Sequence, residues 1–343
     1  MNEPTENTKV MMLLCSNWGK DAETVKPLSP GEFNDIAAWL DSEGLEFADL
    51  IGKNDVLELY HRKPVSGIEP SGLETLLKNG AGMALRTEQW LNNGLWVLGI
   101  RDPEYPERLK TNLKKYAPPI IYGCGSIRLL SSGGIAVVGS RDIDDQRVSF
   151  TATLCSSAGQ NGITVVSGCA RGADQVAMHS ALEACGSVVG VLAGDLARAA
   201  IKGFMRESIE SGKSALVSPY KPDAGFSVGN AMGRNKHIYA LSDAVVVISA
   251  SYGKGGTWAG ASENLEKWHI PLYVFDQSDL PGNIQLIKRG AMVLPMEALH
   301  NPAILFANPP RHSGDGLPLN NMSDNNPGDS SEQLSLFTPK SEE

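Results

Sequence analysis

The chain has 343 residues, of which 42% are hydrophobic and 20% charged, so most of it can form a buried core. It has no run of 18 apolar residues and no basic N-terminal segment followed by an apolar one, which excludes membrane-spanning and secreted proteins from the expected classes. The net charge of −9 argues against a nucleic-acid partner for the chain taken as a whole.

The charge is distributed unevenly along the sequence. Residues 134–295 carry 14 basic and 14 acidic residues, whereas residues 296–343 carry 2 basic and 7 acidic ones. A basic site in the middle of the chain therefore requires cations that cluster in space. The chain has an odd number of cysteines and no CxxC pair, so we expect free thiols and a cytoplasmic protein. The cysteines are Cys15, Cys124, Cys155, Cys169 and Cys185.

The N-terminal third divides into two predicted parts. Residues 1–26 show no clear period and are expected to be a flexible N-terminus. Residues 27–93 are predicted to form a small helical domain, in which Ser29 caps a helix that starts at Pro30 and has Glu32 in its first turn. We expect this domain to serve packing or dimerisation rather than direct contact with DNA.

Residues 94–133 are rich in Pro, Tyr and Gly and are interpreted as a connector made of a strand, a short helix and a second strand, packed on the following domain. From 134 to 300, short apolar runs alternate with segments of helical length, which predicts a Rossmann-like, doubly wound, mostly parallel α/β sheet. Its expected strands are Ile135–Val138, Ile163–Val166, Val188–Leu192, Ala215–Val217, Ala244–Ile248 and Leu272–Phe275. Residues 301–343 are predicted to be a disordered tail.

Four segments of the predicted sheet domain carry small residues together with cations or amides. Ligands of doubly wound sheets lie beyond the carboxyl ends of the strands, where backbone amides, hydroxyls and guanidinium groups converge on an anion. A single such segment is more simply a tight turn with a surface cation, but four at one edge indicate a ligand with several phosphates. The candidate binding residues are Gly139, Ser140, Arg141, Ser167, Gly168, Arg171, Gly172, Asn230, Arg234, Asn235, Lys236, Lys254, Gly256 and Thr257.

Several other kinds of site are not indicated. The spacing around Ser211–Ser214 does not fit a Walker A loop, and the loop after the first strand lacks the glycines of a dinucleotide fingerprint. No His/Cys cluster has metal-ligand spacing, and no GxSxG motif is present. We therefore expect no metal, no cofactor and no catalytic residue, and a helix-face hydrogen bond for His179 rather than contact with a ligand.

The ordered motifs resemble those of the DNA processing protein A (DprA/Smf) family. They are Val137–Arg141, Val165–Asp174 with His179 following, Gly229-Asn230 and Arg234–Lys236, preceded by Tyr105-Pro106 and Pro118–Gly123 in the connector. The resemblance covers roughly residues 28–295. It implies a SAM-like helical domain and a Rossmann-like domain that binds single-stranded DNA, forms a homodimer, protects incoming strands and helps to load RecA during transformation or recombination.

An alternative is a nucleotide-binding or nucleotide-cleaving enzyme or sensor, because the Gly-Gly-Thr-Trp loop is also similar to the superfamily of lysine-decarboxylase-like (LOG) proteins. In that superfamily a glutamate closely follows the threonine, whereas here Glu263 comes six residues after Thr257. Only Glu263 or Asp174 is available as an acid or base for such a reaction.

The tail contains a short apolar motif, Gln333-Leu334-Ser335-Leu336-Phe337, within an acidic segment. This motif resembles the pentapeptide with which bacterial replication and repair proteins dock on the DNA polymerase sliding clamp. The three apolar side chains suit an apolar pocket, and the alternative is that the segment folds back on its own domain.

Overall fold

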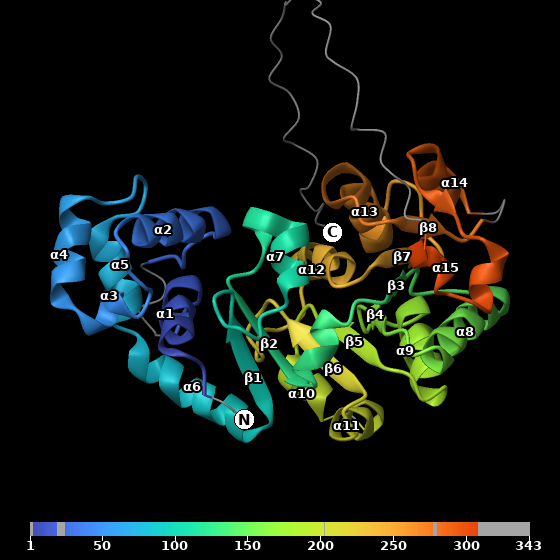
Figure 1. The fold of residues 1–343 in the computed structure, drawn as a ribbon, viewed down its shortest axis with the longest axis horizontal. Helices are drawn as coiled ribbons and strands as arrows, with labels where there is room; N and C mark the ends of the chain where they lie inside the picture. Colours follow the sequence, from blue (N-terminus) through green and yellow to red (C-terminus); the bar gives the residue numbers. More distant parts are fainter. Residues whose placement is uncertain (1–2, 19–24, 202, 277–279, 308–343) are drawn as a thin grey trace, which may run out of the picture. The chain divides into compact units, whose positions relative to one another are not determined.

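Short runs of β-branched residues form a mixed sheet at the centre of the computed structural model (Figure 1). The structure describes residues 3–18, 25–201, 203–276 and 280–307. Within these ranges the sheet has nine strands in the order β1-β2-β6-β5-β4-β3-β7-β8-β9. The strands are β1 (Leu95–Gly99), β2 (Ile120–Gly125), β3 (Ile135–Val138), β4 (Val165–Ser167), β5 (Val188–Val191), β6 (Ser214–Ser218), β7 (Ala244–Val247), β8 (Leu272–Val274) and β9 (Met292–Val293).

The topology confirms the predicted Rossmann-like sheet. Strands β3 to β9 are paired in parallel. From β3, the strands β4, β5 and β6 follow one another on one side, and β7, β8 and β9 follow on the other side. The strand order therefore reverses between β3 and β7, which is the switch point where such sheets bind ligands. The predicted strands of this domain agree with the observed ones to within two residues at either end.

The connector contributes two strands to one edge of the sheet. β1 pairs with β2, and β2 pairs with β6, both in the antiparallel sense. Helix α7 (Glu107–Leu113) lies between them in the sequence, so the predicted strand–helix–strand order is observed.

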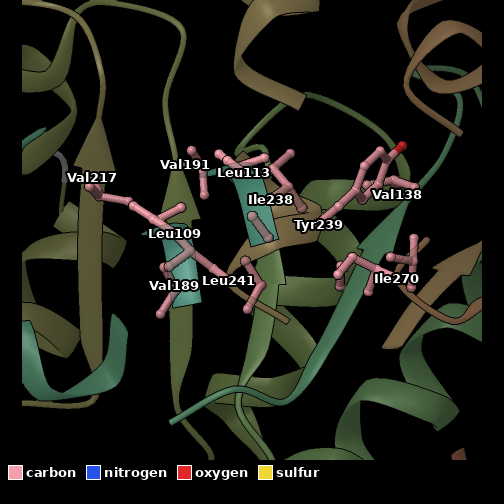
Figure 2. Packing of buried hydrophobic residues seen from close by; sticks show 14 of the residues in the cluster. Leu109, Leu113, Val138, Val189, Val191, Val217, Ile238, Tyr239, Leu241 and Ile270 are labelled. Carbon is pink, nitrogen blue, oxygen red and sulfur yellow. The ribbon is translucent and has the colours of Figure 1, made fainter. Parts of the chain in front are cut away.

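Helices cover both faces of the parallel strands, as their apolar runs require. Alternate strand residues face two separate hydrophobic clusters: Ile135 and Val137 face α8 and α9, whereas Ala136 and Val138 face α7, α12 and α13. Figure 2 shows the second cluster, in which side chains of α7 and α12 pack on the strands. The helices of this domain are α8 (Asp145–Gln160), α9 (Ala173–Glu183), α10 (Leu196–Ala200), α11 (Gly203–Glu210), α12 (Val228–Ala240), α13 (Gly255–Glu263) and α14 (Pro281–Lys288).

The predicted helical region contains α2 (Pro30–Ser42), α3 (Asp49–Gly52), α4 (Asn54–Arg62), α5 (Pro70–Leu77) and α6 (Gly80–Asn92). Ser29 accepts a hydrogen bond from the Glu32 amide while the Glu32 side chain accepts one from the Ser29 amide, so the predicted capping box is present. These helices share one hydrophobic cluster with β1 and β2. No helix in the described ranges is long and apolar enough to cross a membrane.

The expectation that residues 1–26 are flexible is wrong for Glu6–Cys15, which form helix α1. The five side chains from Val10 to Leu14 are all buried in the cluster beneath the helical region. Asp102 fixes the start of the helix, because its carboxylate accepts hydrogen bonds from the hydroxyls of Thr5 and Thr8 at 2.7 Å each. Five consecutive buried residues cover all sides of the second half of the helix, so it has no amphipathic period, which explains why the pattern indicated none.

The expectation of disorder from residue 301 onward is also wrong at its start. Ile304–Ala307 form a helical turn, α15, and Leu305 is buried. The motif Gln333–Phe337 lies outside the described residues.

Candidate functional site

A pocket of about 610 Å³ opens at the carboxyl ends of β3 and β7, at the switch point of the sheet. The loop after β3, the loop after β7 with the first turn of α13, and residues along α12 from Val228 to Tyr239 form its walls. Ala170 and Asp174, from the segment after β4, complete it. The predicted edge of the sheet therefore does carry a concave site.

The structure brings many of the predicted binding residues together and separates others. The pocket is lined by Gly139, Ser140, Arg141, Arg234, Asn235, Lys254, Gly256 and Thr257. Arg171 and Gly172 line an adjoining, shallower hollow, which also includes Arg141. The remaining four, Ser167, Gly168, Asn230 and Lys236, line neither of these hollows.

Arg234, Asn235 and Lys236 were expected in a strand-end loop, and this is wrong, because they lie in helix α12. Ser227 begins the helix by accepting a hydrogen bond from the Asn230 amide at 3.0 Å. Successive helical residues point about 100° apart, so the three side chains separate. Asn235 donates a hydrogen bond to the Gly256 carbonyl at 2.9 Å and links α12 to α13.

Arg141 and Lys254 are the exposed cations of the pocket. Neither forms an ion pair with a carboxylate of the described ranges. The Arg141 guanidinium lies 5.8 Å from the centre of the Phe226 ring. Lys254 immediately precedes α13, whose first turn has no side-chain cap, so free backbone N–H groups and an ammonium lie at one place.

Arg234 has a different environment, because its side chain is buried at 6% exposure. Its Nη1 donates hydrogen bonds to the carbonyl oxygens of Gly168, at 2.6 Å, and Val191. Burial lowers the pKa of this guanidinium. Arg234 therefore links the ends of β4 and β5 through these two hydrogen bonds at the buried wall of the pocket. This corrects the expectation that it acts as a surface cation.

Asp174 is also buried next to Gly168. Its Oδ2 accepts a hydrogen bond from the Gly168 amide at 3.1 Å. Burial raises the pKa of the Asp174 carboxyl to about 6, while the Arg234 charge and backbone donors, including Ala170, act in the opposite direction. A Cβ at Gly168 would overlap both Arg234 and Asp174, so only glycine fits between them.

Hydrogen bonds within and between the loops hold the pocket edge in place. The hydroxyl of Thr257 donates to the Gly139 carbonyl at 3.0 Å, and the Ser140 amide donates to the Ser249 hydroxyl at 3.1 Å. The Ser167 hydroxyl is fully buried and donates to the Val137 carbonyl at 2.7 Å. Ser167 is therefore a structural residue, which corrects its expected role as a ligand contact.

The loops after β3 and β4 touch at Gly172. This residue has a φ of +84°, and a Cβ there would overlap the carbonyl oxygens of Ser140 and Arg141. The next amide, of Ala173, donates to the Ser140 carbonyl at 3.2 Å. The motif Arg171-Gly172 thus fixes the position of the loop that carries Arg141.

Arg171 and His179 lie in the adjoining hollow. Arg171 is exposed and forms an ion pair with Asp142 at 3.1 Å. His179 Nδ1 lies 3.2 Å from Glu183 Oε1 one helical turn away, which confirms the expected helix-face partner.

Aromatic and apolar side chains around the pocket were not predicted as site residues. Phe226, Val228, Met232 and Tyr252 are exposed, and Trp258 packs edge-on against Tyr252 with their ring centres 5.0 Å apart. All but Tyr252 line the pocket. An aromatic residue close to a cation in the same loop is the sequence signal that could have indicated these rings. The side chains that surround each ring in space come partly from other loops, which the sequence does not reveal.

The acidic groups considered for catalysis are occupied in structural contacts. Glu263 pairs with Lys267 at 3.2 Å and does not line the pocket, whereas Asp174 organises the surrounding backbone. Across the described ranges, no group of three or more His, Cys, Asp or Glu side chains is arranged to hold a metal ion.

Comparison with known proteins identifies the family. Residues 96–301, well over half of the chain, match the family model of DNA recombination-mediator protein A. The chain belongs to this family. The resemblance to the DNA processing protein A family seen in the sequence is thereby confirmed, and the pocket lies within the matched part of the chain.

Among its relatives is the protein Smf of Escherichia coli, which is 30% identical over 192 residues, or 54% of this chain and 51% of Smf. The chain spans about half the length of the curated relatives it matches. The structure of DNA processing protein A from Streptococcus pneumoniae has the same fold, with a TM-score of 0.66 and 19% identity over 90% of this chain and 99% of that chain. The corresponding Helicobacter pylori protein, whose structure is described for its single-stranded DNA binding mode, gives a TM-score of 0.52 and 24% identity over 61% and 95%.

Proposed function

We propose that this member of the DNA recombination-mediator protein A family binds single-stranded DNA in the pocket at the switch point. The observation that carries the proposal is that Arg141 and Lys254 line one pocket without a carboxylate partner in the described part of the chain. Unpaired cations next to the uncapped first turn of α13 suit phosphate groups. The family's role in DNA processing supports this ligand.

The exposed rings near these cations favour a single strand over a duplex. Phe226 lies under the Arg141 guanidinium, and Tyr252 and Trp258 lie at the opposite loop. An aromatic ring stacks on a base only when that base is unpaired, and each such contact contributes about 1–3 kcal/mol. The H. pylori relative, named for its single-stranded DNA binding mode, supports the same choice.

The proposed cellular role follows from this ligand and from the family. We propose a cytoplasmic, dimeric protein that protects single strands and helps to load RecA in transformation or recombination, without catalysis. The tail motif Gln333–Phe337 is proposed to recruit the DNA polymerase sliding clamp. Titration of purified clamp with a tail peptide tests this contact, and an unchanged affinity after Phe337→Ala would refute it.

The pocket is tested by fluorescence anisotropy with a labelled oligothymidylate of about 20 nucleotides. Arg141→Ala and Lys254→Ala are each expected to weaken binding about five- to tenfold and to reduce the slope of log K against log salt by about 0.7, the value for one phosphate contact on a single strand. Arg206→Ala, an exposed arginine on α11, is the matched control.

The outcomes separate the possibilities. Competition by unlabelled single strands but only weakly by duplex supports the proposal. Wild-type affinity and salt slope in both pocket variants, or no binding of any oligonucleotide by the wild-type chain, refutes it.

A further inference from the structure

A second group of cations and aromatic rings lies outside the pocket, on the helical layer formed by α7, α12 and α13 (Figure 1). Its members come from three segments: η2 (Lys114–Tyr116) after α7, helix α12, and η4 (Asn264–Trp268) after α13. We call it the lysine–aromatic surface, and it consists of Lys114, Lys115, Tyr116, Lys236, Lys267 and Trp268.

Tyr116 is at the centre of this surface. The residue is 44% exposed, and its ring packs edge-on against Trp268, with ring centres 5.4 Å apart. The ammonium groups of Lys115 and Lys236 lie 5.3 Å and 5.8 Å from the centre of the same ring. An exposed ring with ammonium groups beside it offers a base a stacking partner and its phosphate a positive charge.

Part of the positive charge on this surface has no carboxylate partner. Lys114 and Lys115 form no ion pair with a carboxylate of the described residues, whereas Glu263 pairs with Lys267 at 3.2 Å and also attracts the half-buried Lys236 ammonium. Lys114 also has a φ of +51°, a conformation that costs a non-glycine residue on the order of 1 kcal/mol or more. The turn that presents Lys114 and Lys115 is thus maintained at an energetic cost.

The same elements connect this surface to the pocket. Helix α12 directs Asn235 into the pocket and the next residue, Lys236, toward Tyr116. The segment of α13 and η4 carries Thr257 at the pocket and Trp268 at the surface, eleven residues apart, which corresponds to about 16 Å along a helix. A few nucleotides of one extended strand are enough to cover this distance.

We propose that the lysine–aromatic surface binds a second segment of the same single-stranded DNA, with an unpaired base stacked on Tyr116 and phosphates at Lys114, Lys115 and Lys236. The inference rests on the proposed function of the pocket and extends it from a single site to a path along α12. It commits to a nucleic acid because the exposed ring between the ammonium groups provides a stacking platform, which an acidic protein segment does not require.

The length of the DNA distinguishes the two sites. The full chain is titrated with oligothymidylates of about 6 and about 20 nucleotides, of which the shorter fills the pocket alone. Tyr116→Ala and the double variant Lys114→Ala/Lys115→Ala are each expected to weaken binding of the longer oligonucleotide about tenfold and leave that of the shorter one unchanged. The double variant also reduces the salt slope for the longer oligonucleotide by about 1.4, from two lost phosphate contacts.

Two further variants sharpen the test. Tyr116→Phe retains the ring and is expected to bind as the wild-type chain does. Lys63→Ala/Lys78→Ala removes two exposed lysines from the helical region and serves as the charge-matched control. An equal loss in this control would show an effect of net charge alone and overturn the proposal.

The remaining outcomes separate the two proposals. If Arg141→Ala weakens both oligonucleotides while the Tyr116 and double-lysine variants bind the longer one like wild type, the pocket stands and the second segment is refuted. In that case an acidic protein segment is the remaining candidate ligand of the lysine–aromatic surface. If the wild-type chain binds neither oligonucleotide, the proposed function itself fails.

Discussion

The buried guanidinium of Arg234 gives a prediction that separates a structural residue from a ligand contact. Arg234→Ala removes the donor to the Gly168 and Val191 carbonyls and the positive charge that acts on Asp174. Each buried acceptor left without a partner costs about 1 kcal/mol or more, and a buried charge that loses its partner adds to this. We expect the free energy of unfolding to fall by about 3–5 kcal/mol.

Urea denaturation followed by tryptophan fluorescence measures this loss. Burial places the pKa of Asp174 at about 6, so its carboxyl is mostly ionised at pH 7.5 and mostly protonated at pH 5. The difference between wild type and Arg234→Ala is therefore expected to be smaller at the lower pH. Adding Asp174→Asn to the variant is expected to recover part of the loss, because the uncompensated charge is then absent.

The exposed Arg141→Ala is the control and is expected to change stability by no more than about 0.5 kcal/mol. The reasoning is refuted if Arg234→Ala unfolds at the same urea concentration as wild type but no longer binds DNA. That result would make Arg234 a ligand contact, as the sequence alone had suggested.

Three other changes test individual buried contacts of the fold. Burial lowers the pKa of His237 to about 3, so the unfolded chain binds the proton at a higher pH than the folded chain, and stability is lost as pH falls below 6.5. Relative to His237→Asn, the wild-type free energy of unfolding should fall by about 1.4 kcal/mol per pH unit down to pH 5. Parallel plots of stability against pH for the two proteins would contradict this. Asp102→Ala leaves two hydroxyls and an amide without their acceptor and should cost about 2–4 kcal/mol in urea denaturation, whereas the exposed Glu104→Ala should cost almost nothing. Gly172→Ala should destabilise the chain by about 2 kcal/mol more than Gly162→Ala in thermal unfolding, because both have positive φ but only Gly172 lacks room for a Cβ; equal losses would rule out the clash.

The strands could be predicted because their apolar runs are set by burial on both faces, a local property of the sequence. Helix α12 could not, because Gly229 and Gly233 disfavour a helix, and it is stabilised by packing of residues such as Ile238 on the sheet. Its existence decides where three adjacent residues point: Arg234 to the carbonyls at the ends of β4 and β5 beside the pocket, Asn235 to Gly256 and Lys236 to Tyr116.

The pocket itself was predicted at the correct edge, because all parallel strands end there. The sequence could not distinguish the cations that remain exposed, such as Arg141, from those used inside the protein, such as Arg234. That difference depends on contacts between loops distant in the chain. The same limit applies to Phe226, which becomes a site residue only through its position under Arg141.

The docking of α1 has a consequence for synthesis on the ribosome. Thr5 and its partner Asp102 are 97 residues apart, so the apolar run from Val10 to Leu14 emerges long before the carboxylate and the edge strands that bury it. At about 5–20 residues per second, these partners are made roughly 5–20 s after the run itself. A nascent chain that stalls before residue 102 therefore lacks the carboxylate that fixes the start of α1, and its run Val10–Leu14 can pack only on the helices made by then.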